Sequence, residues 1–296
     1  MKMKMYLQRL AVLFLIILLT SCSTPVYTSD SSDTVPETLS DYLSSALAPQ
    51  DESKITEYST ASQVQSTTEV SSHDINEAYE KYSSALDGFL EISGFSAESE
   101  AVIVISGVAE FNLTYGISEV RDGESVYFRS QLSKFVYDSN AQISESVFTD
   151  KYSDGETTYN RTSPYQSSSS GEITSEPTGS GTEDLMSYIN YFDKGNVINL
   201  DSSSDDSGLK LIFTLDPSSM KAEVEEMISS LNYEDIRMTA YVVTANINND
   251  GYLTSESINV NFYYDTGYRE YSGTVQIYTQ INDINGKISI DAPDWL

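Results

Sequence analysis

Few side chains in this sequence could serve acid–base or nucleophilic catalysis. His73 is the only histidine and Cys22 the only cysteine among 296 residues. A Ser-His-Asp or Cys-His arrangement needs a histidine that the fold holds beside its nucleophile, and His73 directly follows a polar stretch rich in Ser and Thr. Asp and Glu are abundant, but in an acidic chain most of them belong to the solvated surface. We therefore predict that the protein is not an enzyme and uses no cofactor.

One segment has the spacing of a metal-binding loop. Asn246, Asn248 and Asp250, followed by Gly251, match the first half of a calcium loop. The twelfth position is Ser257, where such a loop carries a bidentate glutamate. Because the segment also lies between two runs of alternating apolar residues, it predicts a β-hairpin turn and no metal site.

Cys22 follows a segment that has three zones. Basic residues come first (Lys2, Lys4 and Arg9), an apolar run spans residues 10–19, and small residues precede the cysteine. The apolar run is too short to cross a hydrocarbon core, which takes roughly 20 residues. This order is typical of a cleaved export signal, which we place at residues 1–21.

The four residues Leu19, Thr20, Ser21 and Cys22 resemble the bacterial lipobox. The resemblance implies that a diacylglyceryl group is attached to the Cys22 sulfur and that the chain is cut before this residue. Acyl chains such as palmitate would then hold the protein in the cell membrane, on its extracytoplasmic face. Two chains anchor firmly where one does not, because each buried methylene contributes about 0.8 kcal/mol. The alternative is an ordinary secretory signal followed by a chance cysteine.

Residues 22–72 are predicted to be a tether. Ser and Thr dominate this stretch, and Pro25, Pro36 and Pro49 are spread along it. Such a composition cannot bury enough apolar surface to offset the entropy lost on ordering. As a flexible coil it would reach about 40 Å. The remaining residues, 73–296, fit one larger domain.

The charge of the chain is strongly negative. The sequence has 45 acidic against 16 basic residues, for a net charge of −29. This balance argues against binding to nucleic acid or to anionic lipid headgroups, both of which need basic patches. It suits a cationic partner, a loosely held divalent cation or, most simply, good solubility outside the cell.

Three helices are predicted in the domain. Over residues 74–90 a capping box is followed by apolar residues at helical spacing. A short second helix is predicted over 183–192. The third begins at Asp216 and Pro217, which are an N-cap residue and a first-turn proline, and its apolar stripe runs over 220–231.

Strict alternation of apolar and polar residues predicts strands, for example over 111–117, 209–215, 241–247, 258–264 and 275–281. Asp-Gly pairs mark hairpin turns between such runs. They lie at Asp122-Gly123, Asp154-Gly155 and Asp250-Gly251. We therefore predict an α+β fold, in which a large curved antiparallel sheet of about 9 to 11 strands forms an incomplete barrel with three helices.

The order of these features resembles that of the LolA/LppX-type carrier superfamily, in the form found in uncharacterised lipoproteins of Gram-positive bacteria. Local resemblances are the hairpin Lys-Tyr-Ser-Asp-Gly-Glu-Thr-Thr-Tyr at 151–159 and Ile-Asn-Asn-Asp-Gly-Tyr-Leu at 247–253. The resemblance implies an incomplete barrel around helices, with an apolar cavity for a lipid or another lipophilic molecule. No ligand-contacting residue carries over. The 22 tyrosines against one tryptophan are a departure, because they would line a more polar cleft.

Three helices would hardly cover nine or more strands, so either the sheet curls on itself or part of its apolar face stays uncovered. An open, concave apolar face is a ligand site. We predict a non-enzymatic lipoprotein that binds a lipophilic ligand there. One alternative is a surface interaction protein that meets a protein or cell-wall partner through its Tyr-rich or acidic face. Another is an accessory to a neighbouring transporter.

Overall fold

A computed structural model describes residues 72–89, 91–138, 142–164, 171–178, 185–186, 189, 192–228 and 233–296. All of these residues lie in one compact unit. The predicted export signal, Cys22 and almost all of the predicted tether lie outside the described residues. Among the helices of the described residues, none is both long and apolar enough to cross a membrane.

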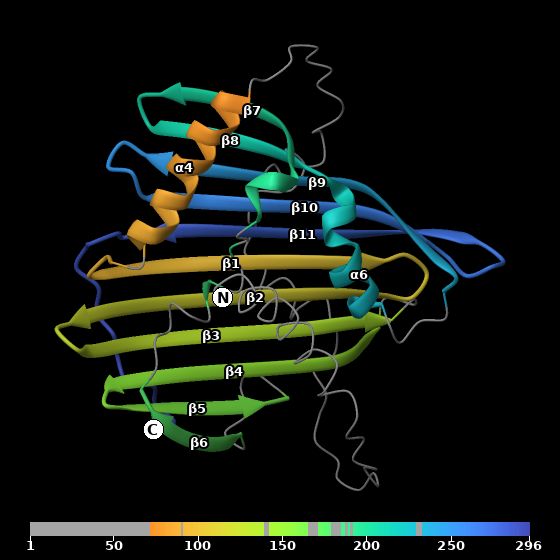
Figure 1. The fold of residues 1–296 in the computed structure, drawn as a ribbon. Coiled ribbons are helices and arrows are strands. Elements are labelled where there is room, and N and C mark those ends of the chain that lie inside the picture. The colour runs from red at the N-terminus through yellow and green to blue at the C-terminus, as the bar shows by residue number, and fades with distance from the viewer. Residues whose placement is uncertain are drawn as a thin grey trace, which may run out of the picture. The chain divides into compact units, whose positions relative to one another are not determined.

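The described chain is dominated by an 11-stranded antiparallel sheet (Figure 1). Its strands are β1 (Gly94–Ile105), β2 (Ala109–Asp122), β3 (Ser125–Asp138), β4 (Ile143–Gly155), β5 (Thr157–Ser163), β6 (Glu172–Pro177), β7 (Val197–Asp205), β8 (Gly208–Leu215), β9 (Asp235–Asn248), β10 (Leu253–Asp265) and β11 (Glu270–Asn282). The prediction of a large antiparallel sheet is confirmed.

The strand order is β6-β5-β4-β3-β2-β1-β11-β10-β9-β8-β7. The sheet therefore consists of two meanders, β1 to β6 and β7 to β11. They meet where β1 pairs with β11. In that pairing Ala101 lies opposite Ile277, and Ile103 lies opposite Val275. The edge strands β6 and β7 stand at the two ends of the order, so the sheet is open.

The three Asp-Gly pairs form the hairpin turns that the sequence predicts. Gly123, Gly155 and Gly251 have positive φ angles of 62°, 97° and 86°, which glycine adopts without steric cost. In the last of these turns the Asn248 side chain accepts hydrogen bonds from the backbone N–H groups of Asp250 and Tyr252, at 3.0 and 2.9 Å. The calcium-loop spacing is therefore explained by a turn.

The prediction of three helices in a LolA/LppX-like incomplete barrel is wrong. The described residues contain two α-helices, α4 (Ser72–Phe89) and α6 (Lys221–Met227). The segment predicted as a helix over 183–192 lies largely outside the described residues. Of that segment, the described residues Leu185, Ile189 and Phe192 are buried in the core.

The predicted third helix is shorter than its apolar stripe suggests. The Asp216 side chain accepts a hydrogen bond from the Ser218 N–H at 3.0 Å, but the first turn is a 3-10 helix, η3 (Pro217–Met220). The α-helix α6 then ends at Met227. Another 3-10 turn, η2 (Lys194–Asn196), precedes β7.

Figure 1 shows α4 and α6 on the same side of the sheet. We call this side the helix-side face and the opposite side the outer face. The core lies between the two helices and the helix-side face. Tyr82 and Phe89 of α4 are fully buried there, and the Phe89 ring contacts the Phe95 ring of β1 with centroids 4.7 Å apart.

Candidate functional site: the helix-side face

The helix-side face is defined by the side-chain alternation of the strands. In β1, Ala97, Ala101 and Ile103 are buried, whereas Glu98 and Glu100 between them are exposed. Residues directly opposite one another on paired antiparallel strands point to the same face. The register therefore assigns the face of every strand from β1 outward.

The apolar part of this face extends over the middle of the sheet. Its members on β1 to β3 include Ala101, Ile103, Leu113, Ile117 and Val136, which are all under 9% exposed. The main sheet contacts of the described helices are elsewhere, since α4 packs on β7, β9 and β10, and α6 packs on β9. We call the apolar surface of β1 to β3 the apolar seat.

Aromatic contacts hold α4 beside the seat. The Tyr82 ring stacks on Phe192 with centroids 5.2 Å apart, and Phe192 also contacts Phe213 of β8 at 4.9 Å. The Tyr79 hydroxyl donates to the Phe192 carbonyl oxygen at 2.8 Å. These contacts tie α4 to the β8 side of the sheet, whereas Phe89 near its end contacts Phe95 of β1.

A row of polar groups is buried within the apolar middle of the face. The Tyr82 hydroxyl donates to Glu256 Oε2 of β10 at 2.6 Å, and both residues are at most 1% exposed. Ser99 and Thr279 share a hydrogen bond of 2.8 Å in the same row. Burial, and next the charge of Glu256, hold the pKa of Tyr82 well above its usual range. Tyr82 is therefore a neutral donor to a buried carboxylate.

The face becomes polar toward the β6 edge. Ser130 and Lys134 of β3 lie opposite Ile117 and Leu113, so they continue the apolar rows of β2 with polar side chains. Lys134 is 6% exposed, and its Nζ lies 2.8 Å from Glu145 Oε1 of β4. A buried lysine costs free energy unless it is paired in this way. We call the helix-side surface of β3 to β5 the polar half.

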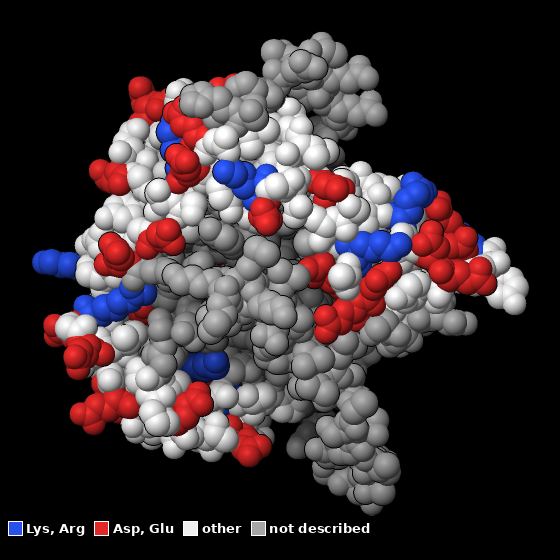
Figure 2. Space-filling model, in the orientation of Figure 1, with Lys and Arg blue, Asp and Glu red and all other residues white. Residues whose placement is uncertain are grey.

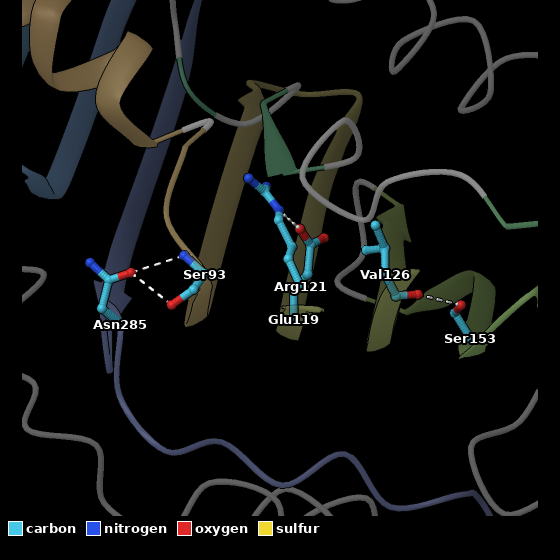
Figure 3. A network of polar contacts seen from close by, with 6 residues as sticks. All are labelled: Ser93, Glu119, Arg121, Val126, Ser153 and Asn285. Atoms are coloured by element: carbon cyan, nitrogen blue, oxygen red, sulfur yellow. Dashed lines mark hydrogen bonds and ion pairs between the residues drawn. The ribbon is translucent and has the colours of Figure 1, made fainter. Parts of the chain in front are cut away.

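A buried carboxylate lies where the seat and the polar half meet. Glu119 of β2 is fully buried, and its Oε1 accepts from Arg121 Nε at 2.8 Å. Nearby, the Ser153 hydroxyl of β4 donates to the Val126 carbonyl oxygen at 2.8 Å. Figure 3 shows both contacts. Charged and neutral hydrogen bonds therefore lie at this border, beside the buried rings of Phe95 and Phe128.

Two buried polar atoms on β5 have no hydrogen-bond partner. They are Thr158 Oγ1 and Asn160 Oδ1, and their residues lie opposite Ser153 and Lys151 on the helix-side face. Thr158 is only 3% exposed. An unsatisfied buried polar group costs about 1–3 kcal/mol. These two atoms, on residues two apart along β5, therefore mark a place where a polar group of a ligand can bind.

Sequence reasoning missed the polar half. The predicted strands were identified by apolar alternation, whereas β3 to β5 carry polar residues on both faces. The available signal was the change from β2, which alternates strictly, to β4, in which Thr149, Lys151 and Ser153 occupy helix-side positions. This change shows that the face is divided and is not uniformly apolar.

Of the other residues singled out in the sequence, Cys22 lies outside the described part of the chain. His73 is in the first turn of α4, and the Asn246–Asp250 segment is the β9–β10 turn. Among the described residues no group of three or more His, Cys, Asp or Glu side chains could hold a metal ion. Figure 2 shows acidic and basic side chains interspersed around the helix side, with acidic ones in the majority.

Comparison with known proteins adds little. No protein-family model matches the chain, and no curated protein matches it significantly. Among solved structures, a β-barrel-like protein of the domain of unknown function DUF1849 from Brucella abortus is 10% identical. The alignment covers 65% of this chain and 99% of that one, with a TM-score of 0.19. Such a score does not show a shared fold, so the resemblance to LolA/LppX-type carriers stays a prediction about family.

Proposed function

We propose that this protein is a non-enzymatic lipoprotein, anchored by Cys22 to the extracytoplasmic face of the cell membrane, that binds a lipophilic ligand on its helix-side face. The observation that carries the proposal is the apolar seat on β1 to β3, which lies outside the main contacts of both described helices. A contiguous apolar surface outside the main contacts of the described helices is suited to an apolar guest.

The energetics favour such a guest. Each methylene that a ligand moves from water onto an apolar surface contributes about 0.8 kcal/mol. A chain of several methylenes therefore supplies enough free energy to bind without ion pairs. The seat also fits the place of the protein, because a lipid anchor keeps the domain within reach of membrane lipids.

Two measurements test this function. Protein purified from its native membrane is examined by native mass spectrometry for a co-purifying lipophilic molecule. The recombinant domain is then titrated with N-phenyl-1-naphthylamine, whose fluorescence rises in apolar surroundings. We expect a bound native molecule and a saturable fluorescence rise that the native molecule reverses. Absence of both would refute the proposal.

Neighbouring positions of β1 provide a matched pair of variants. Ala101→Trp places a large ring in the seat, whereas Val102→Trp places the same ring on the outer face. We expect the first to abolish probe binding and the second to leave it unchanged. If Ala101→Trp does not fold, Leu113→Thr makes the seat polar with a residue suited to a strand, and the same loss is expected.

A second function is favoured by the outer face. The rings of Phe135 and Phe148 meet edge to face with centroids 5.4 Å apart, and Tyr137 stacks beside Phe135 at 6.5 Å. All three are partly exposed, and such aromatic groups are enriched at protein interfaces. We propose this surface as the alternative, a contact for an envelope protein. A pull-down from envelope fractions that Phe135→Thr weakens, and Ala101→Trp does not, would support it.

A further inference from the structure

We propose that the polar half binds an uncharged, hydroxyl-bearing headgroup of an amphiphilic ligand, such as a polyol or sugar, at Thr158 and Asn160. The inference rests on the proposed function, because it assigns the polar end of the ligand whose apolar end lies on the seat. It begins from the two partnerless atoms, Thr158 Oγ1 and Asn160 Oδ1.

The position of the two groups suits one ligand group. They are two residues apart on β5, so their side chains point to the same face of the sheet. Their cross-strand partners, Ser153 and Lys151 of β4, lie on that face as well. Ser153 already donates to Val126 O and shares a 3.0 Å hydrogen bond with Thr178 Oγ1. Its hydroxyl therefore has other partners and leaves Thr158 unsatisfied.

The chemistry of the two atoms selects the headgroup. Asn160 Oδ1 only accepts, whereas the Thr158 hydroxyl both donates and accepts. A ligand hydroxyl can donate to Asn160 Oδ1 and accept from Thr158 in one arrangement. A carboxylate or phosphate only accepts, so it would satisfy Thr158 and repel Asn160 Oδ1. Vicinal hydroxyls, as in a sugar or polyol, can serve both atoms at once.

The surroundings agree with a neutral headgroup. Further hydroxyls line the same rows, since Thr149 and Thr162 lie opposite one another on β4 and β5 with 3.5 Å between their oxygens. The net charge of −29 disfavours anionic ligands, and the positive charge of Lys151, which lies opposite Asn160, disfavours a cationic headgroup. Strands are about 4.8 Å apart, so roughly 10 Å separates β5 from β3. An alkyl chain attached to a headgroup at β5 would therefore reach the apolar seat.

Calorimetric titration of the recombinant domain tests the inference with amphiphiles that differ only in the headgroup. The probes are octyl β-D-glucopyranoside, octanoate and octylammonium, each below its critical micelle concentration. We expect the glucoside to bind at least tenfold more tightly than either charged probe. Equal binding of the three would overturn the headgroup assignment and leave the proposed function intact. Failure of all three to bind would count against the proposed function itself.

Variants separate binding from a structural role. Thr158→Val keeps the shape of the side chain and removes its hydroxyl. We expect it to weaken glucoside binding about tenfold, to weaken octanoate binding less, and to leave the melting temperature of the free domain the same or higher. Asn160→Leu should act in the same direction. Thr114→Val, on the exposed outer face of β2, is the control and should change none of these values.

A fall in the melting temperature of Thr158→Val would overturn the inference, since it would mean that the hydroxyl has a partner within the protein. Unchanged glucoside affinity in both Thr158→Val and Asn160→Leu would also overturn it.

Discussion

The indole Nε1 of Trp295 donates a hydrogen bond to Asp150 Oδ2 at 2.8 Å, across 145 residues of sequence. Asp150 lies on the outer face of β4 and also accepts from Arg129 Nε and Nη2 of β3, at 3.3 and 3.2 Å. The Arg161 guanidinium of β5 lies 5.3 Å from the centroid of the Trp295 ring. The only tryptophan therefore fastens the C-terminal residues to three strands of the outer face.

We expect Trp295→Phe to lower the free energy of unfolding by about 1–2 kcal/mol, because it removes a hydrogen bond to a partly buried carboxylate. Urea unfolding followed by far-UV circular dichroism measures the change. Leu296→Ala is the control, since Leu296 is 55% exposed, and should have little effect. Equal midpoints for Trp295→Phe and the wild type would show that the bond contributes nothing to stability.

Tyr82→Phe should destabilise the domain by about 2 kcal/mol at neutral pH, because buried Glu256 loses a short hydrogen bond. Tyr79→Phe, which loses a bond to a backbone carbonyl, is the comparison and should cost less. Equilibrium unfolding in urea gives both values. A larger loss in Tyr79→Phe would contradict the role assigned to Tyr82.

The same residue predicts a dependence on alkaline pH. The raised pKa of Tyr82 means that the folded state keeps its proton when the unfolded state, with a pKa of about 10, has lost it. This contribution to stability is complete below about pH 10 and is lost as the pH rises further. The difference in unfolding free energy between wild type and Tyr82→Phe should therefore shrink above pH 10. A constant difference would contradict the prediction.

The turn between β4 and β5 predicts a dependence on acid pH. The Asp154 carboxylate accepts from the backbone N–H groups of Thr157 and Glu156, at 2.8 and 3.0 Å, and these bonds lower its pKa. Its stabilising effect is present above the ordinary pKa, about 3.9, and is lost as the pH falls through the lower folded value. Asp154→Ala should therefore lower the melting temperature at pH 7 but not at pH 2. Glu124→Ala, in the turn between β2 and β3, is the comparison variant.

Gly273 of β11 predicts a packing effect. A Cβ at this position would overlap the Phe262 ring, which covers the glycine from β10 and is 1% exposed. Gly273→Ala should lower the free energy of unfolding by about 1–3 kcal/mol, the usual cost of overpacking. Gly116→Ala on β2 is a matched control, because nothing lies within 4 Å of its Cβ position. Similar stability of the two variants would contradict the assigned contact.

Cys22→Ala tests the anchor. If Cys22 carries the lipid, the variant should no longer be recovered in the membrane fraction of the host cell. It should also no longer incorporate a metabolic palmitate label. The wild-type protein should be solubilised from membranes by detergent and not by high salt. Membrane retention of the variant would show that the lipobox prediction is wrong.

The sequence predicted local features well, because they depend on side-chain period and on turn chemistry. A period of two defines a strand with one buried face, and strict alternation over residues 209–215 and 275–281 gave β8 and β11. Asp-Gly pairs defined three hairpin turns. The helix predicted over 183–192 lies largely outside the described residues, although its apolar positions Leu185, Ile189 and Phe192 are buried, as their spacing indicates.

Only the tertiary structure decided which strands meet and what lies on each face. The alternation of β1 does not show that its neighbours are β2 and β11, since a strand with one apolar face can pair with many others. The Tyr82–Glu256 bond spans 174 residues, and the polar half arises because Lys134, Thr158 and Asn160 share a face with Ile117 and Leu113. Such proximity follows from the register of several strands together, which no local segment encodes. The sequence by itself determined the kinds of elements and the candidate anchor at Cys22, whereas long-range pairing decided where the apolar seat and the polar half lie.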